Sequence, residues 1–249
     1  MILLRSLLFY AGAIASLLVF TVIAPLVYPL PYPQRYWIVT RWTHLTLWWL
    51  EVICNLRCRV SGLENIPKGP AVILCKHQSA LETMALQRFF PPQVWVLKRS
   101  ILRLPLFGWC MATLEPIAID RSSAPAALKQ VVKEGKKRLK RGQWITLFPE
   151  GTRVAPGEKG KYAVGGGVLA AQAGCPVVPV AHNAGLFWPR NSILKRPGVI
   201  DVVIGPVINP RDKTAAEIMY IAEDWIETTS DRLLYEAGVT PEAISEKEA

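Results

Sequence analysis

The sequence predicts an α/β fold in which a mixed, largely parallel sheet is flanked by helices and an N-terminal helical segment binds a membrane. Two observations predict it. After residue 57, short apolar runs typical of buried strands alternate with stretches of helical periodicity. Before it, two stretches are rich in apolar and aromatic residues. We therefore expect membrane-anchoring or interfacial helices over 1–56, the α/β domain over 57–213, and an amphipathic helix with a polar tail over 214–249.

The composition limits the class of protein. Of the 249 residues, 51% are hydrophobic and 19% are charged, which excludes a disordered chain. The 29 Lys and Arg residues exceed the 19 Asp and Glu residues, giving a formal net charge of +10. Positive charge on an apolar chain favours a membrane surface or phosphorylated lipid as partner, and no aromatic interleaving indicates nucleic acid. The five cysteines suggest neither a disulfide framework nor a metal site, which favours a reduced, intracellular protein.

The first segment carries no charge from Ser6 to Gln34. Residues 7–24 are almost wholly apolar, and twenty helical residues would cover about 30 Å, the thickness of a bilayer core. Prolines from Pro25 to Pro33 are expected to stop this helix. The alternative is a signal peptide, but the apolar run is longer than usual for one, so we expect an uncleaved anchor.

The second segment, residues 36–53, holds four of the nine tryptophans. Tryptophan favours the membrane–water interface because its ring is apolar and its N–H needs a partner. We therefore expect a second helix lying at or partly in the interface, with Arg35 and Arg41 near the lipid headgroups. The alternative is a tryptophan-rich helix in the core of the α/β domain.

The α/β domain follows from alternating patterns along the chain. The expected strands cover 71–75, 94–97, 116–119, 144–148, 177–180 and 199–204. The expected helices cover 79–90, 124–141 and 165–173. Six of the nine residues in 133–141 are basic. That run is either a solvated helix face or a contact for anionic lipid or an acidic carrier protein.

A histidine and a carboxylate follow the expected strand 71–75. If His77 precedes the next helix and Glu82 lies in its first turn, the two side chains can meet as a general base and its orienting acid. Ser79 is a suitable N-cap and supports this geometry. The alternative is structural, because Ser79 and Glu82 also have the spacing of a capping box.

Two further strand ends carry polar groups. The strand 144–148 runs into a tight turn that ends at Arg153, and such a turn can bind a phosphate through backbone N–H groups and a guanidinium. Arg121 follows the strand 116–119 in the same way.

Together these motifs resemble the glycerolipid acyltransferase family, most closely its members that acylate lysophosphatidic acid. Residues 77–82 resemble its His-x4-Asp motif, with Glu in place of Asp. Residues 148–153 carry its full Phe-Pro-Glu-Gly-Thr-Arg motif. Residues 118–121 match a third motif in part, and 175–180 match a proline-containing strand motif. The order and spacing agree over about 60–210.

The resemblance implies transfer of an acyl chain from acyl-CoA or acyl-acyl carrier protein to the sn-2 hydroxyl of lysophosphatidic acid, giving phosphatidic acid. His77 would be the general base, and Glu82 would replace the family's Asp. The implied substrate-binding residues are Lys98, Arg121, Glu150, Gly151, Thr152 and Arg153. Lys98, Arg121 and Arg153 would hold the acceptor phosphate, and Glu150 would position the glycerol or the turn.

The implied partners are membrane phospholipids, lysophosphatidic acid and acyl-CoA or acyl carrier protein, with no nucleic acid. No metal or other cofactor is expected, because the thioester is already activated. The expected location is the cytoplasmic face of the inner or plasma membrane. Glu115 and Ala118 stand where the family usually has Gly and Phe, which leaves room for an ornithine-lipid or lipid A type of acceptor. A membrane-attached lipid hydrolase and a lipid-binding protein are the remaining alternatives.

Overall fold

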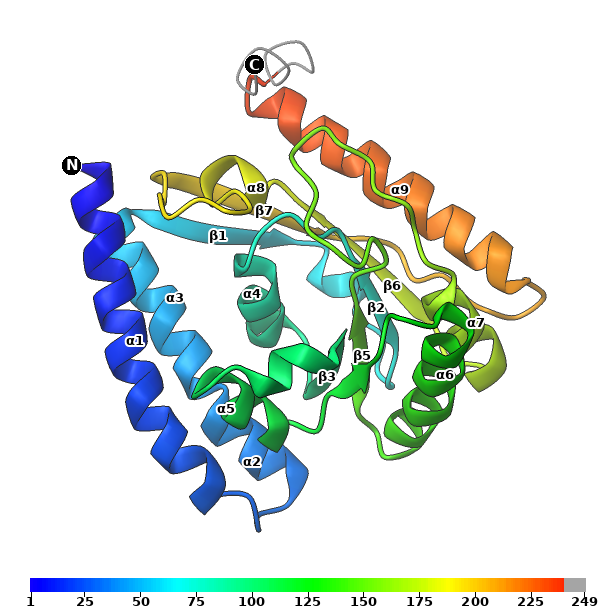
Figure 1. The fold of residues 1–249 in the computed structure, drawn as a ribbon. Coiled ribbons are helices and arrows are strands. Elements are labelled where there is room, and N and C mark those ends of the chain that lie inside the picture. The colour runs from blue at the N-terminus through cyan, green and yellow to red at the C-terminus, as the bar shows by residue number, and fades with distance from the viewer. Residues whose placement is uncertain (240–249) are drawn as a thin grey trace.

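A seven-stranded sheet forms the centre of the fold, seen in a computed structural model that describes residues 1–239 (Figure 1). The strand order is β1-β7-β6-β2-β5-β3-β4, and only the β6–β7 pair is antiparallel. The strands are β1 (Leu56–Ser61), β2 (Val72–Cys75), β3 (Gln93–Lys98), β4 (Ile117–Ile119), β5 (Trp144–Leu147), β6 (Val177–His182) and β7 (Gly198–Ile204). The predicted mixed, largely parallel sheet is confirmed.

Helices cover both faces of the sheet (Figure 1). One face carries α6 (Ala124–Lys140), α7 (Gly165–Ala173) and α9 (Ala215–Glu236). The other carries α3 (Arg41–Cys54) and α4 (Leu81–Phe89), with α1 (Ile2–Leu26) outside α3. The shorter helices are α2 (Tyr32–Val39), α5 (Phe107–Thr113) and α8 (Ala184–Phe187).

Burial on both faces explains the apolar strands. In β2, Ile73 and Cys75 join the core under α3 and α4, whereas Val72 and Leu74 join the core under α7 and α9. A strand covered on both sides needs apolar side chains at every position, so its pattern is a continuous run. All six predicted strands are present at these runs.

The structure contains an edge strand, β1, that is not among the predicted strands. Its sequence alternates charged and apolar residues, because one face is solvated, and that short pattern was not recognised as a strand. Arg57 and Arg59 point outward from it, and the Arg59 guanidinium pairs with Asp201 of β7 at 2.5 Å. The domain boundary near residue 57 therefore falls inside a strand.

The second N-terminal segment forms two helices, where the prediction had one over 36–53. α2 begins at Tyr32, and Pro33 lies in its first turn, where the absent proline N–H is not needed. The chain turns at Thr40, and α3 then continues to Cys54. The prolines therefore end α1 as predicted, but one of them also starts the next helix.

The tryptophans of this segment divide between two environments. The indole N–H groups of Trp42 and Trp49 bond to α1, at Ser16 Oγ (3.2 Å) and the Leu8 carbonyl (3.3 Å). Trp48 is 55% exposed. Gly12 permits the close contact, because a Cβ there would lie 2.2 Å from the Trp49 ring nitrogen. Helix α3 also buries leucines in the core, as expected of a core helix, and the interfacial position stays a prediction that the exposed Trp48 permits.

Helix α1 is the one described helix that is long and apolar enough to cross a membrane. It nevertheless lies along the domain, because both of its ends are attached (Figure 1). Near its start, Ser6 Oγ accepts the backbone N–H of Lys195 at 2.8 Å, and Tyr10 bonds the Lys195 ammonium at 2.7 Å. Near its end, Thr21 lies 3.7 Å from the Cys110 sulfur on α5. The outward face remains apolar.

The C-terminal helix is present as predicted. Thr214 and Glu217 form a capping box at its start, in which each side chain binds the other's backbone N–H. Its apolar side packs on β6 and α7. Residues 240–249 of the expected polar tail lie outside the described residues.

Candidate active site

A histidine and a glutamate form a hydrogen-bonded pair where the chain leaves β2 and enters α4. His77 Nδ1 lies 2.7 Å from Glu82 Oε1. The Glu82 side chain is 2% exposed and that of His77 is 15% exposed, so only the histidine reaches the surface of the site. A carboxylate can only accept a hydrogen bond, which places the proton on Nδ1 and leaves Nε2 free to accept one.

The Glu82 carboxylate also receives backbone hydrogen bonds. Its Oε1 accepts the N–H groups of Gln78 (3.0 Å) and Ser79 (2.8 Å). Burial raises the pKa of Glu82, but the nearby imidazole of His182 and the bonds from His77 and Ser79 outweigh it and leave the pKa below its usual value. Glu82 is therefore held as a carboxylate beside His77.

The capping box expected at Ser79 is only half formed. Helix α4 begins at Leu81, after Ala80, and the Ser79 hydroxyl accepts the Leu81 N–H at 3.2 Å. Glu82 still takes the Ser79 N–H, as a capping box requires. The same oxygen binds His77, so the structural and orienting roles of Glu82 coexist.

The turn after β5 holds His77 on three sides. The Phe148 ring stacks on the imidazole, with centroids 4.2 Å apart and planes at 19°. Glu150 Oε2 accepts the His77 N–H at 2.8 Å, and the Val154 N–H donates to the His77 carbonyl at 2.9 Å. Strand β5 pairs with β2, so the sheet itself brings the two motifs together.

Two arginines lie at the same edge of the sheet. The Arg121 guanidinium, just after β4, donates to the carbonyl of Gly151 in the turn. Gly151 has φ +68, a conformation that glycine adopts without strain. Arg153 follows in the turn, and the Arg190 guanidinium binds its carbonyl at 2.6 Å. Arg121, Gly151 and Arg153 line one cavity with His77.

That cavity has a volume of about 200 Å³ and is mainly apolar. It lies among α1, α3, α4, α5 and β3. Its apolar lining includes Leu17, Phe20, Val39, Trp42, Met84, Trp95, Phe107, Cys110 and Leu114. The site therefore joins a base, two cations and a space suited to a hydrocarbon chain.

Three predicted substrate-binding residues lie apart from this cavity. The Glu150 side chain is fully buried and contacts Lys76 and the His77 backbone, so its position matches the turn-holding role and not contact with glycerol. Lys98 lines a separate surface depression with Asp120. Thr152 is exposed in the turn. Sequence spacing alone does not show that these three side chains lie outside the cavity, whereas those of Arg121 and Arg153 line it.

The structure adds residues that the motifs did not indicate. His182 at the end of β6 is buried; its Nε2 donates to the Lys76 carbonyl at 2.9 Å, and its Nδ1 accepts the Ala184 N–H at 3.2 Å. Lys76 is buried behind the site and forms an ion pair with Glu227, whose side chain is 14% exposed. The one sequence feature that could have indicated this ion pair is a lysine, Lys76, that follows an apolar strand and directly precedes His77. Within residues 1–239, no group of three or more His, Cys, Asp or Glu side chains is placed to hold a metal.

Comparison with known proteins gives a consistent result. The acyltransferase family pattern matches residues 57–183. A Pseudomonas aeruginosa protein named 1-acyl-sn-glycerol-3-phosphate acyltransferase is 46% identical over 230 residues, covering 90% of this chain and 90% of the relative. A Saccharomyces cerevisiae protein of the same name is 32% identical over 204 residues, covering 77% of this chain and 64% of the relative.

Among solved structures, the fold is similar to that of PlsC, the 1-acyl-sn-glycerophosphate (LPA) acyltransferase of Thermotoga maritima. The TM-score is 0.78 at 20% sequence identity, over 93% of this chain and 95% of the other. At that identity the likeness concerns the fold. It includes the N-terminal helices, because nearly the whole of both chains is superposed.

Proposed function

The chain belongs to the acyltransferase family, and from this premise we propose that it acylates 1-acyl-sn-glycerol 3-phosphate at the sn-2 hydroxyl to form phosphatidic acid. One observation carries the proposal: the His77–Glu82 pair opens onto an apolar cavity that two arginines also line. The reactants need these three features, which are a base for the hydroxyl, cations for the phosphate and space for an acyl chain.

In the proposed reaction, Nε2 of His77 takes the proton of the acceptor hydroxyl as its oxygen attacks the thioester carbonyl. A C–O bond forms, the C–S bond breaks, and the leaving thiolate receives the proton back from the imidazolium. Glu82 keeps the imidazole in the reactive tautomer and stabilises its protonated form through the 2.7 Å bond. Phe148 limits tilting of the ring by stacking on it.

The acceptor test uses purified protein in detergent with a panel of lysolipids. We expect phosphatidic acid from 1-acyl-sn-glycerol 3-phosphate and much slower turnover of lyso-ornithine lipid or lipid A precursors. Free fatty acid as the main product would instead indicate a hydrolase, and no turnover would indicate a lipid-binding protein. Acyl-CoA and acyl-acyl carrier protein are compared as donors in the same assay.

The ion pairs and position of the basic run 133–141 favour a solvated helix face over a docking site for a carrier-protein donor. Arg138 and Arg141 pair with Glu115, and Lys137 pairs with Glu134. Helix α6 leads into β5, so its basic end lies at the edge of the sheet opposite to His77. This position supports the solvated-face interpretation of the run.

Replacing Arg153 by alanine is expected to raise the KM for the phosphorylated acceptor by about 10- to 100-fold, because a charged hydrogen bond to phosphate is lost. The donor KM should change little. Lys161→Ala is the matched control, since Lys161 is an exposed cation of the same loop outside the cavity. Initial rates are measured against both substrates. Equal effects of the two variants on the acceptor KM would rule out a specific phosphate contact by Arg153.

The cavity predicts a graded effect on acyl chain length. Thr83 and Gln87 both line it from α4, one helical turn apart, and Thr83 is the nearer to His77. Thr83→Trp should exclude longer acyl chains that Gln87→Trp still accepts. Turnover is measured over a series of saturated acyl-CoA donors. Arg88→Trp, on the exposed side of the same helix, should keep the wild-type profile. Identical profiles for all three variants would disprove occupation of this cavity by the donor chain.

We propose that the outer face of α1 binds one surface of a membrane and that the protein works at its cytoplasmic face. The attachment of both helix ends to the domain favours embedding along the helix over spanning. Membrane docking shortens the path of a lipid acceptor to His77. The cytoplasmic face is favoured because acyl-CoA and acyl carrier protein are soluble and intracellular, and because the five cysteines are free.

Val22→Glu should lower binding to vesicles that contain anionic lipid by about ten-fold, because a carboxylate is costly in the apolar layer. Val22 is 64% exposed on α1. Tyr220→Glu is the control, since Tyr220 is 72% exposed on α9. Vesicle flotation measures the bound fraction, and turnover of a short-chain soluble substrate should not change. Equal loss of binding in both variants would contradict docking through α1.

A further inference from the structure

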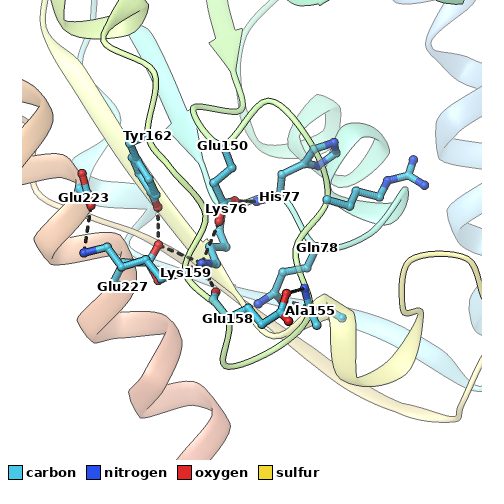
Figure 2. A network of polar contacts seen from close by, with 12 residues as sticks. Lys76, His77, Gln78, Glu150, Ala155, Glu158, Lys159, Tyr162, Glu223 and Glu227 are labelled. Atoms are coloured by element: carbon cyan, nitrogen blue, oxygen red, sulfur yellow. Dashed lines mark hydrogen bonds and ion pairs between the residues drawn. The ribbon is translucent and has the colours of Figure 1, made fainter. Parts of the chain in front are cut away.

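Lys76 is a buried lysine directly before His77, and its charge is balanced by the C-terminal helix. Its side chain is 1% exposed. The ammonium lies 2.9 Å from both carboxylate oxygens of Glu227 on α9. It also lies 2.9 Å from Glu150 Oε1 (Figure 2). Helix α9 lies beyond residue 183, where the match to the family pattern ends, so this contact adds an element to the site.

Glu150 connects this ammonium to the backbone of His77. One of its oxygens faces Lys76, and the other accepts the His77 N–H at 2.8 Å. Figure 2 shows the His77 ring turned away from Lys76, so the connection acts on the backbone of the histidine and not on its ring. The chain of contacts runs from α9 through Lys76 and Glu150 to the residue that carries the base.

The hydrogen bonds of the ammonium go to two groups, the Glu227 carboxylate and the Glu158 carbonyl, each at 2.9 Å. Its 2.9 Å contact with Glu150 Oε1 is an ion pair without hydrogen-bond geometry. Glu227 is itself held, because the Tyr162 hydroxyl donates to its Oε1 at 2.7 Å (Figure 2). The ammonium is therefore held from two sides, by Glu227 of α9 and by the loop that carries Glu158.

The side chains of Lys76 and Glu150 are buried and that of Glu227 is 14% exposed, so water screens the charges of this cluster only weakly. Burial raises the pKa of Glu150, and the Lys76 ammonium and the His77 N–H oppose that effect. If the Glu227 charge is removed, Lys76 is left facing Glu150 as its one carboxylate. The attraction between Lys76 and Glu150 then competes with the hydrogen bond that the His77 N–H donates to Glu150.

We propose that Glu227 is a positioning residue for acyl transfer, which acts through Lys76 and Glu150 to hold the backbone of His77 where its ring can meet both substrates. The inference rests on the proposed role of His77 as the base. Helix α9 then contributes a residue to the site in addition to covering one face of the sheet. A small displacement of a catalytic base lowers the rate of the chemical step while binding is retained.

The test compares Glu227→Gln with Glu223→Gln. Glu223 lies one turn away on the same face of α9 and forms an ion pair with Lys159 at 2.9 Å, so its variant removes the same charge without touching Lys76. We expect Glu227→Gln to lower kcat by about ten-fold. The KM of each substrate should stay within two-fold, and Glu223→Gln should match the wild type. Rates are compared at equal distance below each variant's Tm.

Two further variants keep the result decisive. Tyr162→Phe releases Glu227 without removing a charge, and it should lower kcat in the same direction but less; it decides the matter if Glu227→Gln does not fold. A kcat within two-fold of the wild type in the folded variants, or a rise in KM without a fall in kcat, would overturn the inference. His77→Ala separates this from the proposed function: if it stays active, the base assignment fails, and if it is inactive while Glu227→Gln is normal, only the positioning role fails.

Discussion

Replacing His77 by alanine is expected to lower kcat by at least about a thousand-fold, the largest effect that we predict. General-base catalysis contributes about 10²–10⁴-fold, and no second imidazole faces the cavity among the described residues. His182 cannot substitute for it, because its Nε2 donates to the Lys76 carbonyl and its Nδ1 accepts the Ala184 N–H. Formation of labelled phosphatidic acid by purified protein measures the loss.

The fold should survive this substitution. The backbone of His77 makes two hydrogen bonds that alanine can also make. Its N–H donates to Glu150, and its carbonyl accepts the Val154 N–H. Tm and acceptor binding should therefore stay close to the wild type. His44→Ala is a matched control, because His44 lies on α3 outside the cavity. Turnover by the folded His77→Ala protein above a tenth of the wild-type rate would falsify the assignment of His77 as the base.

Glu82→Gln should lower kcat by about 10²–10³-fold. The amide oxygen can still accept from Gln78, Ser79 and His77, so the local backbone and the tautomer are kept. Glutamine, however, has no negative charge to stabilise the imidazolium that forms during transfer.

Glu82→Asp separates charge from length in the same experiment. It keeps the carboxylate but shortens the side chain by one methylene, so we expect a smaller loss of kcat than with Gln. Normal turnover by Glu82→Gln would show that Glu82 has only its backbone-binding role. An equal loss in both variants would instead attribute the effect to geometry alone.

The charge of Glu82 also affects stability. Its pKa is lowered in the folded protein, so its ionised form stabilises the fold above the pKa of the unfolded chain. This contribution is lost as the pH falls through the lower, folded pKa. The stability difference between the wild type and Glu82→Gln should therefore shrink as the pH falls through that range, as denaturant titrations at several pH values would measure.

Six strands were predictable because each is a short, mainly apolar run, and the central ones, such as β2, β5 and β6, are buried at every position. The edge strand β1 was not, since Arg57 and Arg59 interrupt its apolar run and its partner β7 lies far along the chain. The division between α2 and α3 was missed for a local reason. Pro33 was interpreted as a stop, although a proline in the first turn of a helix is favourable.

The site was predictable where its residues are close in sequence. His77 and Glu82 are five positions apart, and a strand followed by a helix brings them together. Arg121, Gly151 and Arg153 were grouped through the family resemblance, and in the structure they lie together because parallel strands end at one edge of the sheet.

The sequence by itself determined six of the seven strands, the positions of His77 and Glu82 at the end of one of them, and the apolar character of the first helix, because periodicity, capping and hydropathy depend on neighbouring residues. Only the tertiary structure decided that α1 lies along the domain, that Lys98 faces another depression and that Glu150 is buried. It also decided that Glu227 balances Lys76. A buried charge takes whichever partner the packing brings within about 3 Å, and that partner can come from any part of the chain.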